Sequence, residues 1–184
     1  MARVHPSAEV ERGAVIGAGT VVWRHAHVMK DARIGARCML GQGCFVGAGV
    51  RVGDGCRIQN HVSLYGGVEL ADEVFVGPCA VFTNVKRPRA AYPKKPAYDT
   101  TRIGRGATIG ANATIVCGVT IGARAFIGAG TVVTRDVPDH ALVLGTPGRI
   151  EGWICACGAK VARSRTRPRR GSCSVCQIGP CREG

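Results

Sequence analysis

Ten cysteines supply most of the reactive side chains of this 184-residue chain. Four of them form two close pairs near the C-terminus, Cys155-x-Cys157 and Cys173-x-x-Cys176. Thiolates at such short spacings can bind one Zn²⁺ from two sides, and four thiolates leave no open coordination position for catalysis. We therefore predict a structural zinc ion bound by these four residues, with Cys181 as a spare or substitute ligand. Free thiols in a disordered basic tail are the alternative.

The five histidines do not indicate a catalytic metal. His25 and His27 are two positions apart, and no third histidine follows at a spacing that would complete a histidine-bound zinc site. His61 is expected in a turn, pointing outward, either as a solvated residue or within reach of a cleft. We expect the other four histidines on the surface: His5, His25, His27 and His140.

The sequence repeats with a period of six residues, and the fold that this repeat specifies must position these side chains. An aliphatic or aromatic residue opens fourteen consecutive hexads, and the period resumes from Ile103 to Val133 after an interruption. The fourteen openers are Val4, Val10, Ile16, Val22, Val28, Ile34, Leu40, Val46, Val52, Ile58, Leu64, Leu70, Val76 and Phe82. A fixed short period of this kind indicates a solenoid, and hexads indicate a parallel β-helix. We predict an all-β fold in which each opener fills the core and the small fifth residue lies near a corner.

Composition and charge limit the possible partners. No apolar run reaches the roughly 18 residues of a membrane span, and the hexads begin at Val4, so we expect no signal peptide and a cytoplasmic protein. The net charge of +13 suits anionic ligands. Nucleic acid is the less favoured partner, because the basic residues are spread over turns, a loop and the tail.

Two segments depart from the period. Residues 85–101 contain five basic residues among three prolines and cannot form a hexad, so we predict an external loop. From Glu151 onward the chain becomes cysteine-rich and basic. We therefore predict a β-helix domain over residues 1–150 and a small zinc-binding tail over 151–184.

The hexads, over about residues 4–150, resemble the left-handed β-helix of hexapeptide-repeat acyltransferases. This resemblance implies three hexads in each triangular coil, about seven coils, and left-handed winding. It also implies a homotrimer with active sites in the clefts between neighbouring prisms, and acetyl-CoA lying along a prism edge. The cysteine-rich tail resembles a zinc ribbon, although its first pair is Cys-x-Cys where Cys-x-x-Cys is usual.

Three longer runs narrow the resemblance: Ile58-Gln-Asn-His-Val-Ser-Leu-Tyr65, Phe82-Thr-Asn84-Val-Lys-Arg-Pro-Arg89, and the run from Ala107 to Gly122. They resemble transferases that acetylate the 3-amino group of a UDP-linked 2-acetamido-3-amino-glucuronate. Closely similar enzymes act on dTDP-linked 3-amino-3,6-dideoxy sugars. The implied activity is N-acetyl transfer from acetyl-CoA to a nucleotide-linked amino sugar, for a cell-surface glycan such as O-antigen.

The resemblance also implies site residues. Asn84 matches the family residue next to the acceptor amine, where it would orient the amine rather than act as a base. The residues implied on the sugar-nucleotide side are Gln59, Asn60, His61, Tyr65 and Arg89, and the chain departs from the family pattern at His61. Arg149 is the residue expected at the CoA phosphates. From the sequence spacing itself, we expect Ala111 and Ala129, 18 positions apart, on one edge beside acetyl-CoA, and Cys117 in its cleft.

Other functions remain open at this point. One is a related enzyme, either an O-acetyltransferase or an acetyltransferase of dTDP-linked 3-amino sugars. Another is a non-catalytic scaffold like the carbonic-anhydrase-related hexapeptide proteins, in which the zinc tail would be an interaction module. The absence of a histidine triad argues against a catalytic carbonic anhydrase.

Overall fold

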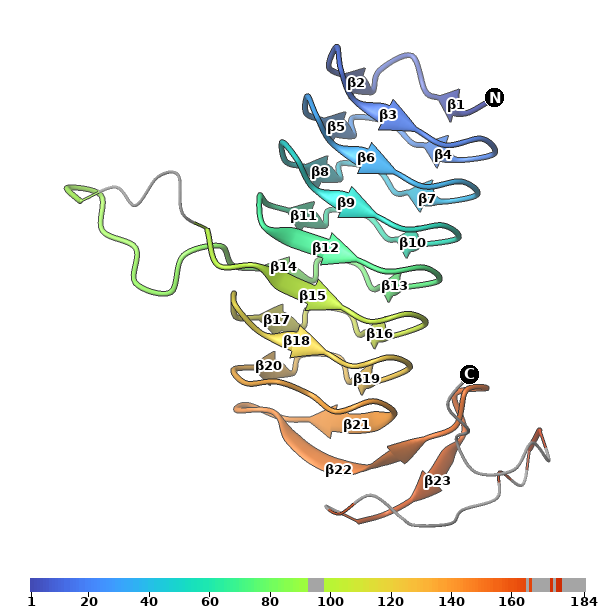
Figure 1. Cartoon of the computed structure of the whole chain (residues 1–184), viewed down its shortest axis with the longest axis vertical. Coiled ribbons are helices and arrows are strands. Elements are labelled where there is room, and N and C mark those ends of the chain that lie inside the picture. The colour runs from blue at the N-terminus through green and yellow to red at the C-terminus, as the bar shows by residue number, and fades with distance from the viewer. Residues whose placement is uncertain (93–97, 165, 167–172, 174, 177–184) are drawn as a thin grey trace.

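The computed structural model describes residues 1–92, 98–164, 166, 173, 175 and 176. Within these residues the chain has no helix and forms a triangular tower of short strands with three faces (Figure 1). None of its described elements is a helix that could cross a membrane. The tower confirms the predicted all-β parallel solenoid.

Each face is one parallel sheet, to which every coil contributes one strand. Face A contains β1 (Arg3–Val4), β4 (Val21–Val22), β7 (Met39–Leu40), β10 (Arg57–Ile58), β13 (Phe75–Val76), β16 (Thr108–Ile109), β19 (Phe126–Ile127) and β21 (Ala141–Leu144). Face B contains β2 (Glu9–Val10), β5 (His27–Val28), β8 (Phe45–Val46), β11 (Ser63–Leu64), β14 (Val81–Phe82), β17 (Thr114–Ile115) and β20 (Val132–Val133). Face C contains β3 (Val15–Ile16), β6 (Arg33–Ile34), β9 (Arg51–Val52), β12 (Val68–Leu70), β15 (Thr101–Ile103) and β18 (Thr120–Ile121).

The tower winds to the left through about seven coils. In Figure 1 the strands of face C run from left to right at the front while the chain descends from the N-terminus. Paired residues before the loop are 18 positions apart, as in Ile58 with Val76. Three turns join the faces of each coil, and we name them corner AB, corner BC and corner CA after the faces that they connect.

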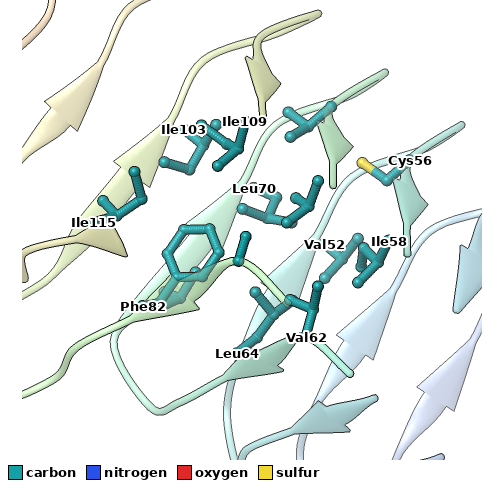
Figure 2. Close-up of a cluster of buried hydrophobic side chains, with 14 of the residues drawn as sticks. Val52, Cys56, Ile58, Val62, Leu64, Leu70, Phe82, Ile103, Ile109 and Ile115 are labelled. Atoms are coloured by element: carbon teal, nitrogen blue, oxygen red, sulfur yellow. The ribbon is translucent and has the colours of Figure 1, made fainter. Parts of the chain in front are cut away.

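The hexad openers form one apolar column inside the tower (Figure 2). Phe82, Leu64 and Ile115 are each no more than 1% exposed and lie in successive coils of face B. The expected burial fails only at the top, where Val4 is 44% exposed because no coil covers it. Thr20, Cys38 and Cys56 lie stacked at the small inward position of corner CA, as the narrow corner requires.

The external loop leaves the tower at corner BC, between β14 and β15 (Figure 1). Across it, Val76 pairs with Ile109 and Phe82 pairs with Ile115, each 33 positions on. That separation is one coil of 18 residues plus 15 additional ones. The insertion therefore leaves the pairing of coils unchanged.

The C-terminal end closes the column with antiparallel strands. Strand β22 (Arg149–Ile154) pairs with β21 and with β23 (Lys160–Ala162), and it runs across residue 150, where the sequence predicts a boundary. Trp153 is 4% exposed and belongs to the core cluster. The expectation of a surface His140 is wrong: it is 6% exposed, with Nδ1 3.0 Å from the carbonyl oxygen of Ile154, because the returning strand covers it.

Candidate functional site

Corner BC positions Asn84 where the loop leaves the tower. Its neighbour Thr83 follows β14, and the Thr83 Oγ1 accepts a hydrogen bond from the backbone N–H of Cys117 in the next coil at 2.9 Å. This bond fixes the strand end directly before Asn84. The Asn84 side chain belongs to a half-buried residue at the base of the loop, so it is both anchored and accessible.

Asp99 brings the returning end of the loop back to this corner. Its Oδ2 lies 3.9 Å from Lys86 Nζ and 3.7 Å from Cys117 Sγ. A Cβ added to Gly118 would lie 2.9 Å from Lys86 Nζ and 3.2 Å from Asp99 Cβ, so both side chains pack over this glycine. Cys117 itself is fully buried and therefore lies behind the corner surface.

Aromatic rings line the same corner in the preceding coil, on the N-terminal side of Asn84. Tyr65 is 41% exposed, and its ring centroid lies 5.6 Å from that of Phe45. On the other side, a Cβ added to Gly66 would lie 3.2 Å from Cδ2 of Tyr98. The returning loop therefore packs over a glycine beside Tyr65. Corner BC thus combines an amide, an ion pair and exposed aromatic surface.

Corner AB carries the other residues predicted for the sugar-nucleotide side. Gln59, Asn60 and His61 occupy the turn after β10. Asn60 Oδ1 accepts a hydrogen bond from the backbone N–H of Gln42 at 2.9 Å, so this side chain joins two coils. His61 is exposed, with a φ of +59°, and its Nδ1 would lie 2.6 Å from a Cβ added to Gly43.

Ala111 and Ala129 also lie on corner AB, in successive coils nearer the C-terminal end. A Cβ on Gly110 would meet the backbone nitrogen of Ala129 at 2.5 Å, and a Cβ on Gly77 would meet that of Ala111 at 2.6 Å. The two alanines therefore share one edge, as their spacing predicts. Asn84, Tyr65 and Cys117 are brought together at one corner, and these two alanines and the Gln59 turn at another.

Two predicted arginines lie away from both groups. Arg89 is exposed in the loop, where its Nη1 donates a hydrogen bond to the Pro88 carbonyl at 3.0 Å. Arg149 lines a cavity of about 220 Å³ at the C-terminal end of the column, with Val133, Val137 and Val143 among its neighbours.

The four C-terminal thiols form a compact cluster. Their Sγ atoms all lie within 4.8 Å of one another. Cys155 Sγ is 3.4 Å from Cys176 Sγ, and Cys157 Sγ is 3.5 Å from Cys173 Sγ. The backbone N–H groups of Cys176 and Val175 lower the pKa of Cys173 to about 6. Four sulfurs at about 2.3 Å from a tetrahedral zinc ion stand at similar separations, so the donor set fits a zinc ion. Cys181 lies outside the described residues.

Two residues at these corners escaped the sequence analysis. Asp99 is the one acidic residue in the sequence of the loop, 85–101, which was a usable signal. Trp23 is 48% exposed at a position of corner AB that successive coils fill with Gly41, Gln59 and Gly77. An aromatic residue in a column of small and polar residues was also detectable from the register.

Family models match the two parts of the tower that flank the loop. The bacterial transferase hexapeptide model, of six repeats, matches residues 13–48 and 100–135. The hexapeptide repeat of succinyl-transferase matches residues 32–66. The fold and these matches define the chain as a left-handed β-helix built of hexapeptide repeats. The matched repeats are similar to those that the bacterial transferase hexapeptide model describes.

Individual proteins share parts of the tower. The dTDP-3-amino-3,6-dideoxy-alpha-D-galactopyranose 3-N-acetyltransferase of Aneurinibacillus thermoaerophilus is 42% identical over 83 residues, which cover 45% of this chain and 40% of that protein. PerB from Caulobacter crescentus, solved with CoA and GDP-perosamine, superposes with a TM-score of 0.53 and 26% identity, over 82% of this chain and 57% of that one. The acetyltransferase domain of PglB from Neisseria gonorrhoeae FA1090 shares the fold, with a TM-score of 0.54 and 23% identity, over 82% of this chain and 57% of that one. The matched part is about two fifths of the Aneurinibacillus protein and somewhat over half of the two solved chains.

Proposed function

We propose that this chain transfers the acetyl group of acetyl-CoA to the amino group of a nucleotide-linked amino sugar. The single observation that carries the proposal is corner BC, where the loop returns Asp99 beside the Asn84 turn of a hexapeptide tower. The similarity to the Aneurinibacillus N-acetyltransferase and to PerB supports the same substrate class. The acceptor is a 3-amino sugar linked to UDP or dTDP, and the product serves a cell-surface glycan.

The chemistry needs placement rather than a strong base. The amine nitrogen attacks the thioester carbonyl, the C–S bond breaks, and the amine proton passes to water or to the departing CoA thiolate. The amide of Asn84 does not ionise at neutral pH, but its oxygen can accept a hydrogen bond from the amine and so direct the lone pair. Placement of this kind accounts for a large share of many rate enhancements. Asp99 can accept a further hydrogen bond from the amine, which attacks in its neutral form.

A site between copies follows from the separation of the two corners. Within one protomer, corner AB and corner BC lie on opposite sides of face B, so their residues do not meet. A cyclic trimer places corner AB of one protomer against corner BC of the next. The outward side chains of face B include Phe45 and Val81, and Val81 is 47% exposed, which suits an interface. Acetyl-CoA then lies beside Ala111 and Ala129, with its phosphates towards Arg149.

The same proposal gives the C-terminal cluster a structural role. The four sulfurs fit one zinc ion bound by Cys155, Cys157, Cys173 and Cys176. A zinc ion bound there supplies a cross-link between β22 and the segment that follows β23. It takes no part in acetyl transfer, because four thiolates fill its coordination sphere.

Thiol release tests the activity. The full chain is incubated with acetyl-CoA and a panel of UDP- and dTDP-linked 3-amino sugars, with the matching 3-hydroxy sugars as comparison. We expect thiol release with at least one amino sugar and an acetylated product by mass spectrometry. Release with hydroxy sugars alone would indicate an O-acetyltransferase, and release with neither would remove the proposed activity.

Replacement of Asn84 tests its role. We expect Asn84→Ala to lower kcat/KM roughly 100-fold, the size of effect that misplacement of a reacting group by about 1 Å produces. Thr120→Ala, which changes an exposed side chain of β18, is the matched control and should leave kcat/KM unchanged. An Asn84→Ala enzyme with the kcat/KM of the unmodified chain would remove this role.

A further inference from the structure

Two hollows on the upper part of face A form a groove that extends from the Gln59 turn of corner AB across the face. The first lies at corner AB and is lined by Trp23, Arg24, Met39, Gly41, Gln42, Gln59 and Asn60. The second crosses the face towards corner CA and is lined by Arg3, Gly19, Val21, Trp23, Arg37, Cys38, Met39 and Arg57. Trp23 and Met39 belong to both, so the hollows are continuous. We call them together the Trp23 groove.

Trp23 offers an aromatic surface in this groove. Its side chain is 48% exposed, and it follows β4 at the point where the chain turns from face A to face B. In the next coil, Gly41 occupies the equivalent position of the turn, since the Trp23 backbone N–H donates to the carbonyl of Leu40, the residue before Gly41. Gly41 lines the same hollow as the indole, and Asn60 of the following coil packs closely against this glycine. An exposed aromatic face of this kind stacks well on a nucleobase.

Arginines surround the indole. Among the described residues that line the two hollows, four are arginines and none is acidic: Arg3, Arg24, Arg37 and Arg57. Arg37 pairs with Asp54 at 3.3 Å, outside the lining, which leaves the groove with an excess of positive charge. Arg57 is held in place because its Nη1 donates to the Arg37 carbonyl at 2.9 Å. A guanidinium has five donors, so a positioned arginine can still bind phosphate oxygens in pairs.

The groove lies at a suitable height in the tower. Strand β4, before Trp23, and β13, in the coil of Asn84, are separated by three strand spacings along face A, about 14 Å. Copies in a cyclic trimer stand at equal heights, so Trp23 of one protomer lies the same distance along the axis from Asn84 of its neighbour. A base, a ribose, a diphosphate and a sugar ring joined in series fill such a length. Gln59 and Asn60 lie between the two ends.

We propose that the Trp23 groove binds the nucleoside diphosphate of the sugar substrate, with Trp23 stacked on the base and Arg57, whose strand lies between that of Trp23 and the coil of Asn84, binding the diphosphate. The inference rests on the proposed function for its role in catalysis, but not for the binding itself. CoA also contains a nucleoside diphosphate. We assign the groove to the sugar nucleotide, because the cofactor residues lie in later coils.

The chain's two tryptophans give a direct test. Trp153 is buried in the core, and Trp23 is exposed in the groove. In Trp153→Phe the fluorescence reports on Trp23 alone, and in Trp23→Phe it reports on Trp153 alone. We expect UDP or dTDP to quench the first variant with a saturable curve and to leave the second unchanged. Uridine or thymidine should bind more weakly than the diphosphate, and CoA should not compete.

Calorimetry on the unmodified chain keeps the test independent of how Trp153→Phe folds. We expect Trp23→Ala to weaken nucleotide binding roughly ten-fold, the range of one lost base stack. Arg57→Gln should weaken it about ten-fold or more through the lost charged hydrogen bonds. Arg33→Gln removes the same charge from face C and should leave affinity unchanged. No binding of UDP or dTDP, or equal losses in all three variants, would overturn the groove.

Kinetics separate this inference from the proposed function. Arg57→Gln should raise KM for the sugar nucleotide and leave KM for acetyl-CoA unchanged. Thiol release with an amino sugar, without nucleotide-dependent quenching of Trp23, would support the proposed acetyl transfer and contradict nucleotide binding in the Trp23 groove. Quenching without thiol release would keep the groove and remove the proposed reaction.

Discussion

The tower and the C-terminal ribbon hold their backbones in place by different means. In the tower, each strand is paired by the coils above and below, and the openers form one apolar column. The described ribbon has two antiparallel strands, of which β22 buries Trp153 against the end of that column. Beyond Ile154, four thiols lie close together in the place where a larger domain would have its own apolar core. The difference illustrates that an element too small to bury its own apolar surface requires a cross-link.

The largest effect is expected from a substitution in the apolar column of the tower. Phe82 is 1% exposed in the middle of the column, whereas its neighbour Val81 points outward and is 47% exposed. We expect Phe82→Ala to lower the free energy of unfolding by about 3–5 kcal/mol, because it leaves a cavity. Val15→Ala, which shortens a side chain that is 49% exposed on face C, is the matched control and should change stability by about 0.5 kcal/mol or less. Chemical denaturation measures both, and equal losses would contradict a column that carries the stability.

Removal of the metal tests whether a zinc ion stabilises the C-terminal ribbon. Its effect on stability should be smaller than that of Phe82→Ala. The purified chain should contain about one zinc ion, measured by mass spectrometry. A chelator should release it and remove hydrogen-exchange protection at Ile154 and Cys155, which carry the bonds from the ribbon to His140 and Ala159. Protection in the column around Phe82 should persist.

Thiol variants supply the control for that experiment. Cys155→Ser should lower the zinc content, whereas Cys79→Ser, which changes an exposed thiol at corner AB, should not. A metal content that is unaffected by Cys155→Ser would rule out the cluster as the site. Loss of protection throughout the tower after chelation would show that the two regions are not independent.

The smallest expected effect concerns a surface ion pair between coils. Glu73 accepts hydrogen bonds from Arg105 Nε and Nη2, each at 3.1 Å, and these bonds with the arginine charge lower the pKa of Glu73. A lowered carboxylate pKa contributes stability above the unfolded value of about 4.3, and this contribution disappears as the pH falls through the folded value. Glu73→Gln should therefore lower Tm slightly at pH 7, and this difference should disappear as the pH falls through the folded value. A difference that persists at acid pH would exclude the ion pair as its cause.

The period of six predicted the tower because repetition is a local property of the sequence. The openers from Val22 to Val133 are buried, and the external loop leaves the tower where the period is interrupted. The four thiols come together because paired spacing is equally local. His140 was placed wrongly because its burial depends on β22, which antiparallel pairing brings back over the end of the column.

The candidate site was less predictable, since it depends on which corner each residue occupies. Counting by six places Asn84 and Cys117 in register, but the loop's return through Asp99 cannot be read from the period. The Trp23 groove combines side chains from four strands of face A with those of the turns at corner AB. Such combinations exist only in three dimensions.

The unchanged register across the loop has a practical consequence. The coils on either side of residues 83–100 pair as they would in an uninterrupted tower. Both ends of the inserted segment are therefore joined to strands that are held in place by pairing. The entropy of closing such a segment rises only slowly with its length. Segments of other lengths and sequences can therefore be transplanted at this corner while the coils on both sides keep their pairing.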